Sequence, residues 1–221
     1  MDIMEAIAGR HSVRQYQDKP LTAEIIAALE REIDVCNREA GLHIQLVTNE
    51  PRAFDSRLAH YGSFKGVTNY FALIGPKGPA LEEKCGYYGE KLVLAAQMLG
   101  LNTCWVALTY KKVPDAFQVG PGEKLAVVIA LGYGDNQGTE RKSKTPQQVS
   151  NLTEASPAWF KKGVEAALLA PTAVNQQKFI LTQEGNTVTA RAGLGFYSKI
   201  DLGIVKYHFE AAAGTENFEW A

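Results

Sequence analysis

The sequence has little cysteine and almost no net charge. It contains three cysteines, Cys36, Cys85 and Cys104, in 221 residues, and its formal net charge is -1. An odd, widely spaced set of cysteines argues against a disulfide framework, and the absence of CxxC or paired histidines argues against a structural zinc site. The balanced charge gives no reason to expect nucleic acid or an anionic membrane surface as a partner.

Long apolar runs are also absent. No stretch approaches the roughly 20 residues that cross a bilayer. The start, Met1 to Glu5, is acidic and lacks the basic-then-apolar layout of a secretory signal, so we predict a cytoplasmic protein. With 46% hydrophobic and 21% charged residues, the chain is long enough to bury a sizeable core.

Several common catalytic signatures are missing. There is no GxGxxG, no GxxxxGK[ST] and no GxSxG, and the carboxylates are scattered without an obvious acid and base pair. These absences weaken the assignments to a dinucleotide fold, a P-loop enzyme, an α/β-hydrolase or a glycosidase.

Periodic apolar positions predict helices, and apolar or alternating runs predict strands. Thr22 is a predicted N-cap, Ser156 another before Pro157, and Ser198 with Asp201 forms a predicted capping box. The predicted helices cover 2–9, 22–38, 86–100, 156–169 and 198–214, and the predicted strands 43–47, 69–74, 103–108, 125–131 and a hairpin of 179–181 with 187–190. This mixture indicates an α+β fold with a mixed, mostly antiparallel central sheet covered by helices on both faces. The polar, irregular segment 135–150 is the best candidate for a boundary.

A basic segment, Arg10 to Arg14, follows the first predicted helix. It carries two guanidinium groups and the Ser12 hydroxyl within five residues. Arginine offers planar, bidentate donors that suit phosphate, so the segment is a candidate anion site. A solvated basic connector is the alternative. The same two interpretations apply to 141–144, which begins with Arg141 and Lys142.

Two further segments combine turns with distinctive side chains. The loop 170–177 contains Pro171, Thr172, Asn175 and Gln176, which could hydrogen-bond the edge of a flat heterocycle or form an ordinary polar turn. The segment 100–106 leads into a buried strand, where a tryptophan is most simply a core residue. Cys104 has no histidine near it in sequence, and we expect a buried, inert thiol.

Taken together and in this order, these segments resemble the FMN-dependent nitroreductase family. Residues 10–16 are similar to its opening motif, Arg-Arg/His-Ser-x-Arg-x-Phe/Tyr, and 100–106 to its Gly-Leu-Gly-Thr-Cys-Trp-Ile stretch, with Asn102 in place of a glycine. Ala130 to Tyr133 followed by Arg141-Lys142 resembles its Gly-Tyr-Pro…Arg-Lys ending, and 170–177 its Ala-Pro-Ser-x-x-Asn-x-Gln-Pro-Trp motif.

The resemblance implies bound FMN and transfer of electrons from NAD(P)H to a nitroaromatic or quinone. It implies phosphate and ribityl contacts from the opening motif and the Arg-Lys pair, packing behind the ring from the buried strand, and ring-edge contacts from the late loop. Lys65 is a loose match to the family's residue that donates a hydrogen bond to the flavin pyrimidine. The implied site residues are Arg10, His11, Ser12, Arg14, Lys65, Thr103, Cys104, Trp105, Val106, Arg141, Lys142, Pro171, Thr172, Asn175 and Gln176. The alternatives are a non-catalytic flavin-binding protein and a flavin-fragmenting or dehalogenating enzyme on the same fold.

One departure from the family is informative. The Ala-Pro-Ser-x-x-Asn motif usually follows the opening motif closely, and in the usual homodimer it reaches the flavin of the other subunit. Here it appears only in the late loop, and two glycine-bounded helices of equal length, 89–100 and 203–214, echo each other. We therefore predict a single-chain mimic of the dimer, monomeric or weakly dimeric, with one FMN. Residues 1–150 would supply the phosphate side and residues 151–221 the flavin edge.

Overall fold

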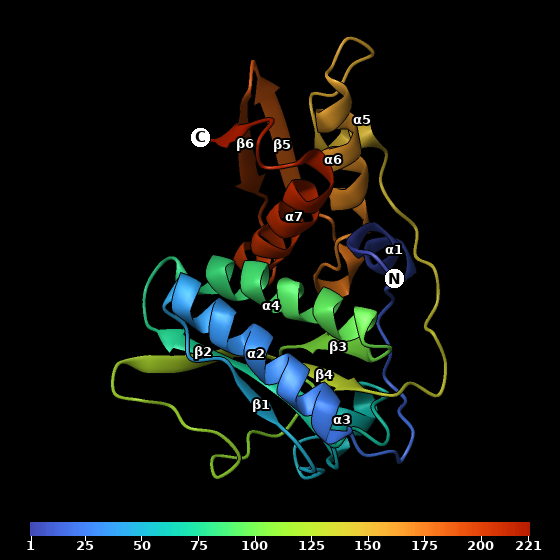
Figure 1. Cartoon of the computed structure of the whole chain (residues 1–221), viewed down its shortest axis with the longest axis vertical. Helices are drawn as coiled ribbons and strands as arrows, with labels where there is room; N and C mark the ends of the chain where they lie inside the picture. The colour runs from blue at the N-terminus through green and yellow to red at the C-terminus, as the bar shows by residue number, and fades with distance from the viewer. The chain divides into compact units, whose positions relative to one another are not determined.

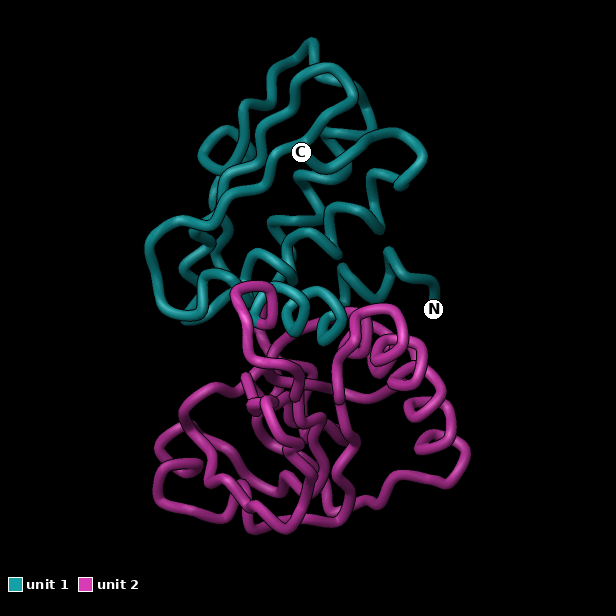
Figure 2. Tube along the Cα trace, turned by 90° about the vertical axis from the view of Figure 1, so that its left-hand side faces the viewer, with its two compact units in different colours: residues 1–9, 82–90, 141–221 teal, residues 10–81, 91–140 magenta.

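The computed structural model describes all 221 residues, and the chain divides into two compact units (Figure 2). Unit 1 comprises residues 1–9, 82–90 and 141–221, and unit 2 comprises residues 10–81 and 91–140. Neither unit is a single stretch of sequence, and helix α4 (Leu81–Met98) contributes residues to both. The proposed roles of the halves 1–150 and 151–221 in a flavin site stay a prediction.

Unit 2 is built on a four-stranded antiparallel sheet with the order β1-β2-β4-β3 (Figure 1). The strands are β1 (Gln45–Val47), β2 (Asn69–Pro76), β3 (Asn102–Val106) and β4 (Glu123–Gly132). Every residue of β2 is buried except the last, which explains its nearly continuous apolar sequence. The antiparallel sheet and the α+β class are as the sequence predicted.

Two helices lie in front of this sheet in Figure 1. The first is α2 (Ala23–Ala40), which begins after Thr22, whose hydroxyl accepts a hydrogen bond from the Ile25 amide, and ends at the left-handed Gly41. The second is the part of α4 that belongs to unit 2, and Lys91 on it pairs with Glu39 of α2 at 3.2 Å. A short helix, α3 (Arg57–Tyr61), was not predicted, because five residues are too few to show a helical period.

Unit 1 combines helices with a small three-stranded sheet of order β5-β6-β7. Its strands are β5 (Phe179–Glu184), β6 (Thr187–Ala192) and β7 (Glu219–Trp220), and Gly185, with φ +60°, permits the tight turn of the predicted hairpin. Its helices are α1 (Ile3–Gly9), α5 (Pro146–Val149), α6 (Ala158–Leu169), α7 (Ser198–Ala213) and residues 82–90 of α4.

Two glycines let α4 and α7 cross at very short distance. A Cβ atom added at Gly203 would lie 2.0 Å from the carbonyl oxygen of Glu83, and one added at Gly86 would lie 2.0 Å from that of Ile200. These contacts are reciprocal, so each helix places its glycine against the backbone of the other. The crossing therefore requires glycine at both positions.

Aromatic rings fill the core of unit 1. The Phe209 ring on α7 has neighbours from α6 and from the C-terminal segment, with centroids 5.1–6.5 Å away. The indole of Trp220 donates to Glu210 at 2.6 Å. The cluster consists of Trp159, Phe160, Phe209, Phe218 and Trp220. The C-terminal residues 215–221 are thus an integral part of unit 1.

Two predicted helix caps are wrong. Helix α6 has Pro157, not Ser156, at its N-cap, and the Ser156 hydroxyl accepts from the Thr153 amide. Helix α7 has Tyr197 at its N-cap with φ +54° and no side-chain cap, because the Asp201 carboxylate is engaged by a distant loop. No helix of the structure is both long and apolar enough to cross a membrane.

Candidate functional site

The basic segment of unit 2 is held between two neighbouring stretches of chain. The Val13 amide donates to the Thr103 carbonyl at 3.0 Å, and Ser12 pairs with Thr103 in a short parallel bridge. On the other side, the Lys65 amide donates to the Arg14 carbonyl at 3.0 Å. Three segments that the sequence predicted for one site, around Arg14, Lys65 and Thr103, are therefore neighbours within unit 2.

Tyr16 fixes the end of this segment. Its hydroxyl donates to the Val13 carbonyl at 2.7 Å, and burial raises its pKa well above the usual range. The backbone at Gly66 passes close to that of Tyr16, since a Cβ atom added at Gly66 would lie 2.3 Å from the Tyr16 carbonyl oxygen. The basic segment thus rests on a rigid support rather than forming a free connector.

Three side chains of the basic segment influence the pKa of the Cys104 thiol. Burial raises the pKa of the Cys104 thiol, while Arg14, a hydrogen bond from Ser12 and Arg10 act in the opposite direction. Arg10 is only 3% exposed, whereas Arg14 is exposed. The thiol is buried, as expected, and its raised pKa makes it a poor nucleophile. Two guanidinium groups and a hydroxyl from one short segment are a donor set that suits a phosphate.

The other residues of the predicted site in unit 2 lie in the basic segment and in β3. His11 is half-buried and packs against Gly138. A Cβ atom added at Gly138 would lie 2.6 Å from the Cβ atom of His11. Thr103 and Val106 are buried in β3, and Trp105 is half-buried. Asn102 accepts a hydrogen bond from the Gly134 amide at 3.0 Å, so the residue that replaces the family's glycine anchors the chain after β4.

In unit 1, residues 170–177 form a tight, strained loop that we name the polar loop. It follows α6 and contains one short turn of 3-10 helix, Ala173–Asn175. Val174, Asn175 and Gln177 all have positive φ angles, +46°, +54° and +45°. Because residues with a Cβ atom rarely adopt this conformation, the loop needs specific contacts to hold its shape.

The segment 141–144 supplies one set of these contacts. The Asn175 side-chain amide donates to the Lys142 carbonyl at 2.9 Å. The Lys144 ammonium donates to the Gln177 carbonyl at 2.6 Å, and its backbone amide donates to the Gln177 side chain at 2.8 Å. Two segments that the sequence assigned separately to the site are thus bonded to each other.

Arg141 lies at the end of α6 in this arrangement. Its guanidinium donates to the carbonyls of Leu168 at 3.1 Å and Ala170 at 2.9 Å. A basic side chain that satisfies the last carbonyls of a helix is a common way to end it. The predicted phosphate contacts of Arg141 and Lys142 stay a prediction.

Asp201, which the sequence interpretation missed as a site residue, holds the other side of the polar loop. Its carboxylate accepts hydrogen bonds from the Ala173 amide at 2.9 Å and from the Gln176 side chain at 2.7 Å. Burial raises the pKa of Asp201 to about 6, against the opposing effect of these two hydrogen bonds. No local pattern could have shown this role, because the partners lie 25 and 28 residues away in sequence.

The predicted site residues therefore form one group in each unit. The group in unit 2 contains Arg10, His11, Ser12, Arg14, Lys65, Thr103, Cys104, Trp105 and Val106, and the group in unit 1 contains Arg141, Lys142, Pro171, Thr172, Asn175 and Gln176.

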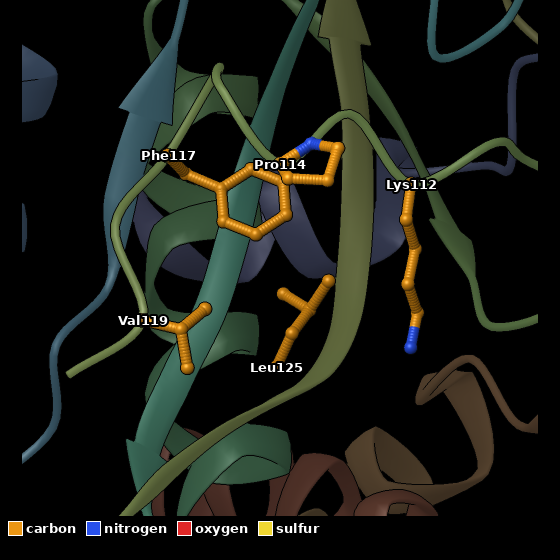
Figure 3. A pocket seen from close by; sticks show the side chains of 5 residues that line it. All are labelled: Lys112, Pro114, Phe117, Val119 and Leu125. Atoms are coloured by element: carbon orange, nitrogen blue, oxygen red, sulfur yellow. The ribbon is translucent and has the colours of Figure 1, made fainter. Parts of the chain in front are cut away.

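A separate groove in unit 2, with a cavity volume of about 450 Å³, includes none of these residues (Figure 3). It is lined by Lys112, Pro114, Phe117, Val119 and Leu125. Its lining is mainly apolar, with the Lys112 ammonium as the single charged group, so it offers no pair of acid and base for catalysis.

The fold is that of the nitroreductase class, as the similarity to solved structures described below shows. A family model described as "Putative TM nitroreductase" matches residues 2–213. The chain belongs to this family. A comparison with curated proteins found no match.

Solved structures agree on the fold. A protein from Thermotoga maritima described as a "putative nitroreductase" is 23% identical, with a TM-score of 0.67 over 96% of this chain and 83% of the other. A "putative nitroreductase in complex with FMN" from Desulfovibrio desulfuricans is 16% identical, with a TM-score of 0.55 over 71% of this chain and 99% of the other. A "Putative NADH dehydrogenase/NAD(P)H nitroreductase" from Parabacteroides distasonis is 24% identical, with a TM-score of 0.52 over 66% of this chain and 95% of the other.

Proposed function

We propose that this protein binds FMN non-covalently and passes electrons from NAD(P)H to an electron-poor acceptor such as a nitroaromatic or a quinone. Membership of the nitroreductase family supports an oxidoreductase, and the similar protein from Desulfovibrio desulfuricans was solved with FMN. The observation that carries the proposal is the short basic segment with Arg10, Ser12 and Arg14, which backbone hydrogen bonds hold against β3 and against the chain at Lys65.

This donor set matches the chemistry of the FMN phosphate. Arg10 and Arg14 offer charged, planar donors, and the Ser12 hydroxyl offers a third donor between them. Lys65 is joined to the same segment through the Arg14 carbonyl, and its ammonium would act near the ring as a further positive charge. Positive groups close to a flavin stabilise the negative charge that its reduced form carries.

The polar loop is the second part of the proposal. Pro171, Thr172, Asn175 and Gln176 would line the isoalloxazine ring, and one chain would hold one FMN. When bound, FMN supplies the hydride and electron transfer, so the protein needs no acid or base of its own for the reaction. This assignment is consistent with the absence of paired catalytic carboxylates from the sequence.

The test begins with the absorbance spectrum of the purified protein. We expect a yellow protein with the visible absorbance bands of oxidised flavin, and oxidation of NADH or NADPH that depends on an added nitroaromatic or quinone. FMN binding without NAD(P)H oxidation would instead indicate a flavin-binding protein without this activity. Oxygen-dependent loss of the flavin would indicate a flavin-fragmenting enzyme, and failure to bind FMN would overturn the proposal.

A further inference from the structure

We propose that Asp201 is a positioning residue that holds the polar loop in the conformation in which it contacts the flavin ring. This inference rests on the proposed function. It adds a residue outside the loop, on α7, that orients the ring-contacting groups without touching the cofactor. The two hydrogen bonds from Ala173 and Gln176 to the carboxylate are the basis of the proposal.

Both carboxylate oxygens are needed as acceptors. One oxygen accepts from the backbone amide of Ala173, at the start of the loop's helical turn, and the other accepts from the side chain of Gln176, at its end. The ionised carboxylate can accept both hydrogen bonds at once. A proton on the carboxyl, or an amide in its place, puts a donor where one of these acceptors is needed.

The strain of the loop explains why such an anchor is required. Three of its residues have left-handed backbone conformations that are unfavourable for side chains with a Cβ atom. The segment 141–144 fixes the loop from one side through Asn175 and Gln177. Asp201 fixes the opposite end of the turn, so loss of this carboxylate leaves the strained backbone anchored from one side.

Gln176 extends the effect of Asp201 to a second loop. Its side-chain amide also donates to the Phe196 carbonyl at 2.8 Å, and the small Gly195 allows the close approach, since an added Cβ atom there would lie 2.3 Å from the Gln176 oxygen. Asp201 therefore determines the position of the Gln176 side chain, and through it the link between the polar loop and residues 193–197.

A structural role alone does not explain a carboxylate at this position. Asp201 is 4% exposed, and both of its hydrogen-bond partners are neutral groups. Apart from burial, the Gln176 amide and the Ala173 amide are the causes of its shifted pKa, and no other ionisable group contributes. Burying an unpaired carboxylate is unfavourable, so a neutral side chain would serve stability better. The charge is explained by the loop conformation that it imposes.

The experiment compares Asp201→Asn with the wild type in FMN and riboflavin binding, followed by quenching of flavin fluorescence. Riboflavin lacks the phosphate, so it reports ring contacts alone and is free of phosphate titration near pH ~6. At pH 7.5 we expect Asp201→Asn to weaken both ligands by a similar factor, roughly tenfold, as for loss of one charged hydrogen bond. We expect the riboflavin affinity of the wild type, but not of the variant, to fall as the pH falls through about 6.

Glu184→Gln is the matched control, because it removes one exposed carboxylate from unit 1 and should leave both affinities unchanged. Gln176→Ala is the second variant, and we expect it to weaken both ligands as well. Circular dichroism establishes that each variant is folded. If Asp201→Asn does not fold, the pH dependence of riboflavin binding by the wild type decides in its place.

The outcomes separate this inference from the proposed function. A folded Asp201→Asn that binds FMN as tightly as the wild type would overturn the role of Asp201 and leave the FMN proposal intact. So would a wild-type riboflavin affinity that does not change between pH 5 and 7.5, from about 1 unit below to about 1.5 units above the carboxyl pKa. If riboflavin binds too weakly to measure, the FMN affinities at pH 7.5 decide alone. Failure of the wild type to bind either flavin would overturn the proposed function itself.

Discussion

At the residue scale, the guanidinium groups of Arg10 and Arg14 are the most direct targets. We expect Arg14→Ala to weaken FMN binding by about 1.5–3 kcal/mol, the usual contribution of a hydrogen bond to a charged group. Arg14 is exposed, so its truncation should not disturb the fold. Arg10→Ala should weaken FMN binding by a similar amount. Because Arg10 is buried, this variant should also be less stable than the wild type. Isothermal titration with FMN measures the affinity of both variants.

Riboflavin is the control ligand for these arginine variants. Because it has no phosphate, its affinity should be nearly the same in Arg14→Ala and in the wild type. An Arg14→Ala variant that binds FMN with wild-type affinity would count against the basic segment as the phosphate site.

The Asp201 carboxyl also gives a prediction about stability and pH. Its folded pKa of about 6 lies above the ordinary value of 3.8, so the folded state holds more protons than the unfolded state between these two values. Stability should therefore fall as the pH rises from about 4 to about 6, by at most roughly 3 kcal/mol at about 1.4 kcal/mol per pH unit. Asp201→Asn should lack this component and be at least as stable as the wild type at pH 7. Urea denaturation at several pH values tests this, and a variant with the full wild-type slope would contradict it.

A buried histidine and glutamate tie three helices of unit 1 together. The His208 ring on α7 lies 2.8 Å from Glu90 on α4 and 3.1 Å from the Ala166 carbonyl on α6, and both side chains of the pair are fully buried. His208→Ala should lower the free energy of unfolding by about 3–5 kcal/mol, because it leaves a buried carboxylate without this partner.

His60→Ala is the matched control for this prediction. His60 is 62% exposed and lies 3.7 Å from the exposed Asp55, and its loss should change stability by less than about 0.5 kcal/mol. Equal and small effects of the two substitutions in urea denaturation would show that the buried pair contributes little.

At the element scale, the crossing of α4 and α7 depends on the absence of side chains. Alanine at Gly203 would normally favour a helix by about 1 kcal/mol. Here its Cβ atom would meet the Glu83 carbonyl oxygen at 2.0 Å and the Tyr87 amide at 2.6 Å, so the helices must separate. We expect Gly203→Ala to reduce stability by about 1–3 kcal/mol in spite of its helix propensity.

Gly78→Ala provides the comparison, since nothing lies within 4 Å of an added Cβ atom there and its φ is not positive. It should be neutral or slightly stabilising. Thermal unfolding of both variants is the measurement, and a Gly203→Ala variant as stable as the wild type would contradict the close crossing.

The elements that the sequence predicted well are those with their own local signal. The apolar stripe and the Thr22 cap defined α2, and Gly185-Asn186 defined the hairpin of β5 and β6. The short α5 and β7 were missed, because four and two residues show no period. The capping box at Ser198 was wrong because a tertiary contact, from Asp201 to Ala173, displaced the local one.

The same division applies to the candidate site. The basic segment could be identified from its composition, because its donors lie within five residues. The bonds from Asn175 to Lys142 and from Lys144 to Gln177 each span 33 residues, and no sequence period connects such positions. The contribution of Asp201 was hidden for the same reason. Local chemistry is visible in the sequence, while the anchors that shape a strained loop depend on the folded chain.

At the scale of the whole molecule, the distribution of motifs along the chain leads to the last prediction. The D. desulfuricans protein aligns over 99% of its own length but over 71% of this chain. The P. distasonis protein aligns over 95% of its own length but over 66% of this chain. The basic segment and the polar loop each occur once, at 10–14 and 170–177, and the two glycines of the α4–α7 crossing make reciprocal contacts within one chain.

We therefore expect one FMN per chain. Titration of the flavin-free protein with FMN, with the protein concentration taken from amino-acid analysis, should reach its equivalence point at one FMN per chain. Sedimentation should show a monomer or a weak dimer at micromolar concentration. Arg14→Ala should weaken this single binding event as a whole, rather than leave half of the binding at wild-type affinity. Two FMN per chain, or half of the sites left intact in the Arg14→Ala variant, would show that a second phosphate site exists outside the basic segment and would contradict the single-chain mimic of a dimer.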